Sequence, residues 1–259
     1  DARLEDFFTE EYALNHLVHR FPKPYVVLMD GIVMGGGMGI AGHGAANALR
    51  IATERTKMAM PETNIGLFPD VGGGWFLARC PGHVGEYLAL TGQVIGGADA
   101  VYAGLADAVV DSAELPQLWE QMAAGDTAAL AAPRSKAQPA PGPLQAARES
   151  IDRFFGLPDI PTLIQALEAD GGDWARDTAA TLRKRSPLML HVVLEQVRRA
   201  RTLSLADDLR MERDMVRNCF QLRPGAASET VEGIRALAVD KDHAPRWNPA
   251  RIEDVTPEM

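Results

Sequence analysis

Cysteine is scarce in this sequence, long apolar runs are missing, and basic residues are outnumbered by acidic ones. The two cysteines, Cys80 and Cys219, lie far apart and have no second Cys or His at metal-ligand spacing. We expect both to be reduced packing residues, as in proteins of a reducing compartment. No apolar run approaches the roughly 20 residues that a membrane-spanning helix needs, so no membrane partner is expected. The net charge of −9 argues against nucleic acid as the main partner, because phosphate neutralisation needs a basic face.

Three common kinds of functional site are also missing from the pattern. The six histidines have no carboxylate partner at ligand spacing, so we predict no metal site. No serine lies in a G-x-S-x-G turn, which excludes the usual α/β-hydrolase nucleophile. No G-x-G-x-x-G follows a strand at the right distance from a ribose-binding acid, so a dinucleotide site is not indicated.

The first half of the 259-residue chain mixes strands and helices. The apolar run at 25–29 is rich in β-branched residues and predicts a buried parallel strand. Near-helical spacing of apolar residues at 3–19 predicts an amphipathic helix. We expect further strands at 32–34, 49–53, 57–60 and 108–110, and helices at 37–48, 71–80, 83–92, 97–105 and 116–123, with Trp119 packed inward from the last of these.

The second half reads as helical. Residues 124–143 are rich in Ala, Gly and Pro and predict a linker between an active-site core at 1–123 and a helical region at 144–259. Within that region we expect helices at 144–155, 160–169, 173–184, 187–201, 204–220 and 229–238. Ser186 followed by Pro187 is typical of a helix N-cap and first turn.

A run of glycines opens the segment that holds the best candidates for chemistry. Gly35, Gly36 and Gly37 precede an expected helix, whose first amides would lack partners and attract an anion or a developing oxyanion. The other interpretation is close helix–strand packing, and the run alone favours neither.

Two acids on loops lie downstream of these glycines. Glu62 follows Pro61, and Asp70 follows Pro69 just before a second run of three glycines. Carboxylates beside glycine-rich backbone suit general acid–base or nucleophilic work. Most loop acids are instead solvated or cap helices, so the pattern alone leaves both interpretations open.

Several segments together resemble a known family. PYVVLMDGIVMGGGMG at 24–39, MPETNIGLFPDVGGGWFL at 60–77 and ALTG at 89–92 are similar to the crotonase, or enoyl-CoA hydratase/isomerase, superfamily. Within it, FFTEEYALN at 7–15, Ser186-Pro187 and the stretch from Glu232 to Pro249 resemble the 3-hydroxyisobutyryl-CoA hydrolase family. The resemblance implies an α/β fold, a ββα spiral followed by a helical C-terminal region. Family members extend further at the N-terminus, so we expect their first lobe to be absent from this sequence.

The resemblance also assigns roles to single residues. It implies that the Gly36 amide is one oxyanion donor, the second belonging to a loop before residue 1, and that Glu11 binds substrate, although its helical position alone indicates a solvated face. Hydratases of the superfamily carry a glutamate where this chain has Gly39, and glycine where it has Asp70. The combination of Glu62 and Asp70 as catalytic and substrate-binding acids with glycine at 39 therefore favours thioester hydrolysis.

The resulting expectation is a hydrolase that cleaves a short branched 3-hydroxyacyl-CoA, such as 3-hydroxyisobutyryl-CoA of valine breakdown. Two alternatives stay open: an enoyl-CoA hydratase or isomerase of the same fold, and a non-catalytic acyl-CoA-binding paralogue. We expect no cofactor, because coenzyme A enters as part of the substrate. The expected location is the cytoplasm, or the mitochondrial matrix of a eukaryote, and the sequence is compatible with a homo-oligomer.

Overall fold

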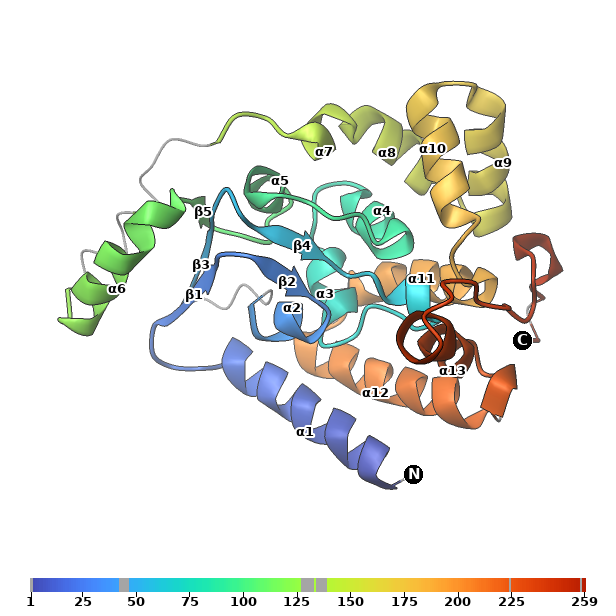
Figure 1. Cartoon of the computed structure of the whole chain (residues 1–259), viewed down its shortest axis with the longest axis horizontal. Helices are drawn as coiled ribbons and strands as arrows, with labels where there is room; N and C mark the ends of the chain where they lie inside the picture. The colour runs from blue at the N-terminus through green and yellow to red at the C-terminus, as the bar shows by residue number, and fades with distance from the viewer. Residues whose placement is uncertain (1, 42–46, 127–132, 134–138, 224, 257) are drawn as a thin grey trace.

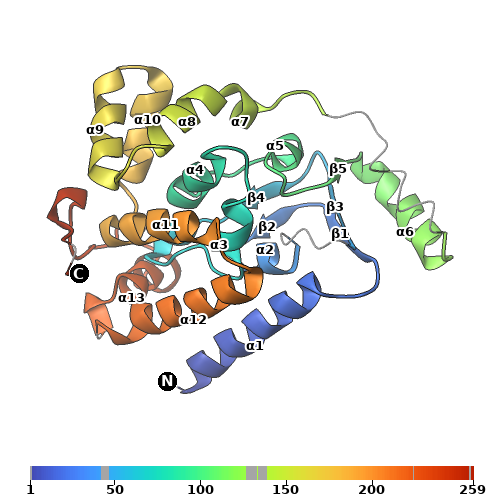
Figure 2. The same ribbon diagram turned by 180° about the vertical axis from the view of Figure 1, so that it is seen from behind.

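Two small parallel sheets lie near one another in the computed structural model of the chain, with helices around them (Figure 1). The structure describes residues 2–41, 47–126, 133, 139–223, 225–256 and 258–259. Seen from behind, the long helices α1 and α12 run side by side along one border of the molecule, and α9 and α10 lie at the opposite border (Figure 2).

Each pairing between two of the described strands is parallel. β3 (Ala48–Ala52) lies between β1 (Tyr25–Met29) and β5 (Ala108–Val109), while β2 (Ile32–Met34) pairs with β4 (Lys57–Ala59). Every residue of β3 is buried, as expected for a parallel strand covered on both faces. The predicted strand at 25–29 and its parallel pairing are confirmed.

The described residues of the first half contain six helices, of which α1 is the longest. They are α1 (Ala2–His19), α2 (Gly36–Ala41), α3 (Gly73–Leu77), α4 (Val84–Thr91), α5 (Gly97–Tyr102) and α6 (Leu115–Ala123), with a 3-10 turn η1 (Glu62–Ile65) between β4 and α3. The helix predicted at 37–48 is described only as α2, because 42–46 lie outside the described residues and Ala48 begins β3. The inward packing predicted for Trp119 is wrong: its side chain is 64% exposed, since α6 buries Leu115 and Leu118 instead.

The second half is helical, as predicted. Its helices are α7 (Pro143–Ala146), α8 (Arg148–Phe155), α9 (Ile160–Asp170), α10 (Asp173–Leu182), α11 (Pro187–Ala200), α12 (Leu205–Gln221) and α13 (Glu229–Ile234), which continues as a π-helical turn over Arg235–Val239. The single helix predicted at 144–155 is two, because α7 docks separately on α5 through the Leu144 amide and the Asp99 carboxylate, 3.1 Å apart. The Ser186 cap is confirmed: its hydroxyl accepts a hydrogen bond from the Met189 amide.

One hydrophobic core joins the two halves. A continuous cluster of buried side chains runs from Tyr12 to Ile252 and includes Leu88 of α4, Phe155 of α8 and Val193 of α11. The helices beyond residue 143 therefore pack on the same core as the strands. Most of 124–143 lies outside the described residues, so its role as a linker stays a prediction.

The structure also describes the cysteines, the apolarity of the helices and the grouping of possible metal ligands. Cys80 is buried and Cys219 is half-buried, and both are free thiols, as predicted. Among the described helices, none is long and apolar enough to cross a membrane. Within the described residues no group of three His, Cys, Asp or Glu side chains could hold a metal ion.

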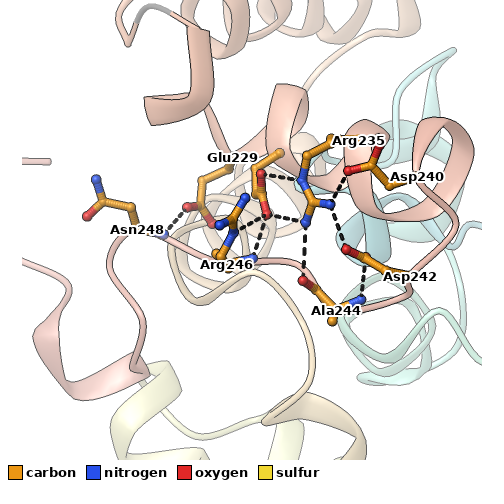
Figure 3. A network of polar contacts seen from close by, with 8 residues as sticks. Glu229, Arg235, Asp240, Asp242, Ala244, Arg246 and Asn248 are labelled. Atoms are coloured by element: carbon orange, nitrogen blue, oxygen red, sulfur yellow. Dashed lines mark hydrogen bonds and ion pairs between the residues drawn. The ribbon is translucent and has the colours of Figure 1, made fainter.

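The segment after α13 is held by a network of charges (Figure 3). The Arg235 guanidinium donates to carboxylate oxygens of Asp240 and Asp242 at 2.6 and 2.7 Å, and the Asn248 amide donates to Glu229 at 2.6 Å. These contacts bind the C-terminal segment back onto α13, the helix that packs against the turn η1.

Candidate active site

Glu62 is the first residue of η1, directly after Pro61. The turn carries its carboxyl group inward, where it is 6% exposed. Among the described residues its Oε2 atom has no hydrogen-bond partner, so an acceptor is left free in a buried place. Burial, followed by the charge of Asp70, raises the pKa of Glu62 well above the ordinary value of a glutamate.

Asp70 lies in the loop between η1 and α3 and is 7% exposed. The Tyr12 hydroxyl, from α1, donates to its Oδ2 at 3.0 Å. That bond lowers the pKa of Asp70, but burial outweighs it and raises the pKa to about 7. Within the described residues no Lys or Arg charge offsets this burial, so Asp70 would exchange its proton near neutral pH.

Replacing Asp70 with asparagine is expected to raise the free energy of unfolding above pH 7. An unfolded Asp70 releases its proton near pH 3.8 and the folded one near 7, so wild-type stability falls as pH rises between these values. The neutral variant lacks this loss, which amounts to about 4 kcal/mol at 1.36 kcal/mol per pKa unit. Urea unfolding at pH 5 and pH 8 measures the part of this loss that falls between those values, about 2.7 kcal/mol for the two pKa units from pH 5 to 7. Asp214→Asn, an exposed acid on α12, controls for lost charge; equal pH slopes in wild type and Asp70→Asn would contradict the expectation.

At the start of α2, Gly35 and Gly36 lie close to the carboxylates of Glu62 and Glu11. Gly36 is the first residue of α2, so its amide has no carbonyl one helical turn earlier. The site where a Cβ of Gly36 would lie is 3.2 Å from Oε1 of Glu11, and the same site on Gly35 is 3.2 Å from Oε1 of Glu62. A side chain at either position would crowd these carboxylates. The structure thus brings Gly36, Glu11 and Glu62 together, with Asp70 joined to them through Tyr12.

Glu11 is half-buried, which corrects the solvated-face interpretation of its helical position. Burial raises the pKa of its carboxyl group. Its Oε1 atom lies against Gly36 because α1 packs on α2, the helix that begins at this glycine.

Gly39 has no room for any side chain. A Cβ there would lie 2.7 Å from Cβ of Val71 and 2.8 Å from Nδ2 of Asn15, closer than real Cβ atoms approach such neighbours. Val71 cannot easily yield, because it is β-branched and holds a positive φ of 55° between Asp70 and Gly72. The packing against Gly39 therefore supports the turn that carries Asp70.

Four further residues contact this region but were not identified from the sequence: Tyr12, Gln196, Asp208 and Glu212. Asp208 and Glu212 are fully buried on α12, on the same face as Leu205, Leu209 and Val216. Two acids at i and i+4 on the apolar face of an amphipathic helix predict that both carboxylates are buried and bind polar groups of the protein. Tyr12 and Gln196 carry no such signal, because their partners Asp70 and Pro69 are distant in the sequence.

The sequence matches proteins of a known family. The profile of the enoyl-CoA hydratase/isomerase family matches residues 1–259. The chain is 38% identical to the mitochondrial 3-hydroxyisobutyryl-CoA hydrolase of Gallus gallus, covering 100% of this chain and 68% of that protein. It is 37% identical to a probable 3-hydroxyisobutyryl-CoA hydrolase of Arabidopsis thaliana, covering 98% and 69%. The chain thus spans about two thirds of the length of these relatives.

Solved structures give the same fold. A carnitinyl-CoA dehydratase from Mycobacterium thermoresistibile is 40% identical with a TM-score of 0.86, covering 99% of this chain and 72% of that one. An enoyl-CoA hydratase from Rhodobacter sphaeroides is 38% identical with a TM-score of 0.88 over the same shares. With the whole sequence matched by the family profile and with this fold, the chain belongs to the enoyl-CoA hydratase/isomerase family.

Proposed function

We propose that this protein hydrolyses a short branched 3-hydroxyacyl-CoA thioester, 3-hydroxyisobutyryl-CoA, to the free acid and coenzyme A. Relatives from a bird and a plant bear the name of that hydrolase at 37–38% identity. The substrate is an intermediate of valine breakdown, which is the role we propose for the chain.

The observation that carries the proposal is the crowding at Gly39. Hydratases that resemble this chain use two glutamates to add water across a double bond, and the first would stand at this position. Because a Cβ at Gly39 would already clash with Val71 and Asn15, the backbone here does not admit that glutamate. One acid of the hydration pair is therefore missing, whereas the buried acids Glu62 and Asp70 remain.

In the proposed reaction Glu62 acts on the thioester carbonyl. Its free Oε2 atom could attack the carbonyl carbon and expel the CoA thiolate, leaving a mixed anhydride that water then hydrolyses. Alternatively, the same carboxylate could take a proton from an attacking water. In both routes negative charge develops on the carbonyl oxygen, which the Gly36 amide at the start of α2 would stabilise.

The other two acids suit substrate binding and orientation. Glu11 lies against Gly36, where it could accept a hydrogen bond from the hydroxyl of the acyl group. Asp70 is held by Tyr12 and raises the pKa of Glu62 by its charge, so it could either orient Glu62 or bind the same hydroxyl. No cofactor enters this scheme, because coenzyme A arrives as part of the substrate.

A side-by-side assay of 3-hydroxyisobutyryl-CoA and crotonyl-CoA tests the proposal. We expect thiol release from the first substrate and little hydration of the second. Thiol release is followed with a disulfide reagent and hydration by loss of the enoyl absorbance. Hydration of crotonyl-CoA without thiol release from either substrate would contradict the proposal.

The second candidate function is hydration or dehydration of an enoyl-CoA. It is favoured by the names of the two similar structures, a carnitinyl-CoA dehydratase and an enoyl-CoA hydratase. We place it second because of Gly39. For the location we propose the cytoplasm, or the mitochondrial matrix of a eukaryote, since the animal relatives are named as mitochondrial and both cysteines are free.

A further inference from the structure

Helices of the C-terminal region form hydrogen bonds to both of the loops that carry Glu62 and Asp70. α13 supports the Glu62 turn, where the Thr230 hydroxyl donates to the Gly66 carbonyl at 2.7 Å. Gly233 of α13 lies so close to Ile65 that an added Cβ would come within 2.3 Å of its backbone. The Asp70 loop is held by a different set of side chains, on α11 and α12.

Glu212 of α12 is the centre of that second set. Its Oε2 atom accepts a hydrogen bond from the Gly72 amide at 2.8 Å, and its Oε1 atom accepts one from the Gly74 amide at 3.1 Å. One turn earlier on α12, Oδ2 of Asp208 accepts from the Trp75 amide at 3.0 Å. The two acids therefore satisfy three backbone amides at the beginning of α3, immediately after Asp70.

Gln196 of α11 holds the other side of the loop. Its Nε2 atom donates to the Pro69 carbonyl at 2.7 Å and to Oε1 of Glu212 at 3.3 Å. Asp70 is thus fixed by bonds to the residue before it and to the second residue after it. Glu212 is fully buried and Gln196 is 2% exposed, so these bonds form away from water.

The hydrogen bonds of Glu212 and Gln196 stabilise a strained backbone conformation directly after Asp70. Val71 has φ 55° and Gly72 has φ 84°, two successive left-handed residues directly after Asp70. A β-branched residue in this region is strained and persists only where its surroundings fix it. Without the acceptor at Glu212, the Gly72 amide would be left unpaired and Val71 could relax, which would move the Asp70 carboxylate away from Tyr12.

Asp208 and Glu212 themselves have raised pKa values. Burial raises the pKa of Asp208 to about 6, and burial together with the charges of Asp208 and Asp70 raises the pKa of Glu212. Two carboxylates this close and this deeply buried share their protons as a pair. Burial, followed by the charges of Asp70 and Glu212, raises the pKa of Tyr12, whose hydroxyl binds Asp70.

We propose that Glu212, with Gln196 and Asp208, forms a positioning clamp that sets Asp70 for the reaction at Glu62. This proposal rests on the proposed thioester hydrolysis for its effect on rate, but the clamp itself is a property of the fold. It makes α11 and α12 part of the support of the active site, because their side chains hold the loop that carries Asp70.

The test is Glu212→Gln, which keeps the size of the side chain but sets an NH2 group against one of the loop amides. Gln196→Met, which removes the donor to Pro69 at similar length, is the second variant. Asp214→Asn is the control, an exposed acid on the same helix α12. Hydrogen exchange of the 71–75 amides is measured for all variants, with thermal unfolding and, for CoA release, kcat and KM.

We expect the 71–75 amides of Glu212→Gln to exchange at least about 10-fold faster, while amides of α4 keep their wild-type rates. A shift of roughly 1 Å at a positioned group can cost 10²-fold, so kcat should fall roughly 10- to 100-fold with KM changed less than about threefold. Gln196→Met should also raise the exchange rates of the 71–75 amides and lower kcat. Asp214→Asn should change neither the exchange rates nor kcat.

Unchanged exchange at 71–75 in both variants would overturn the clamp. Faster exchange with wild-type kcat would overturn its role in positioning Asp70, and a lowered melting temperature with unchanged kcat would show a structural role only. If the wild-type protein released no CoA, the proposed hydrolysis would fail, while the exchange rates would still decide whether the clamp holds the loop.

Discussion

Glu62→Gln is expected to abolish most of the CoA release from 3-hydroxyisobutyryl-CoA. Glutamine preserves the size of the side chain but can act neither as the base that activates water nor as an efficient nucleophile. Loss of a general base typically costs roughly 10²–10⁴-fold, and we expect kcat to fall by that factor with KM nearly unchanged. Steady-state thiol release over a range of substrate concentrations separates the two constants.

The same substitution should not damage the fold. Wild-type Glu62 is buried without a partner for Oε2 among the described residues, and its pKa is raised by burial, so removing the charge relieves a cost. The melting temperature at pH 8 should therefore equal or exceed that of wild type. Glu195→Gln, an exposed acid on α11, is the matched control. CoA release by Glu62→Gln within twofold of wild type would show that Glu62 is not the acting acid, and no release by either protein would favour a non-catalytic paralogue.

Isotope-labelled water separates the two routes through Glu62. In a single turnover, an anhydride that water attacks at the Glu62 carbonyl carbon leaves label in the Glu62 carboxylate and none in the acid product. The general-base route sends label only to the acid product. Mass spectrometry of the product and of the peptide that contains Glu62 measures both, and labelled Glu62 would exclude the general-base route.

Gly39→Ala is expected to destabilise the fold. The added methyl group would lie within 3 Å of Val71 and Asn15, which are buried and cannot move aside without disturbing the Asp70 turn. Overpacking of this kind costs roughly 1–3 kcal/mol and sometimes more. We expect a lower melting temperature and a loss of CoA release together, because the strained Val71 is pushed and Asp70 is its neighbour.

Gly37→Ala is the matched control for Gly39→Ala. Gly37 belongs to the same helix α2, and a Cβ there would meet nothing within 4 Å. Alanine is favoured over glycine in a helix by about 1 kcal/mol, so this variant should be as stable as wild type or more so. Equal melting temperatures and rates for the two alanine variants would contradict the crowding at Gly39. Gly39→Glu is likewise expected to unfold more readily, without gaining hydration of crotonyl-CoA.

Local sequence signals predicted most of the fold because they act within one element. The continuous apolar run gave the strand at 25–29 to the residue, and the Ser186-Pro187 pair marked the start of α11. Where the prediction was wrong, a contact between residues distant in the sequence determined the structure. Trp119 faces solvent because Leu115 and Leu118 of α6 pack in one cluster with Leu49 and Ile51 of β3. α7 separates from α8 because Asp99 of α5 binds the Leu144 amide.

The candidate site divides in the same way. Gly36, Glu62 and Asp70 lie in one stretch of sequence, and family resemblance identified them together with Glu11. Tyr12 meets Asp70 across 58 positions, and Glu212 meets Gly72 across 140, so no local pattern joined these pairs. Buried hydrogen bonds between such distant residues become visible only when the helices that carry them are packed.

By itself, the sequence determined the element types, the family and the residues at which its chemistry is proposed. These follow from periodicity, from turn residues and from motifs that lie close together in the chain. Only the tertiary structure showed that Gly39 admits no side chain and that Glu212 of α12 binds the backbone amides after Asp70. Both depend on which distant atoms approach within bonding distance, and burial then sets the pKa values of the acids that they surround.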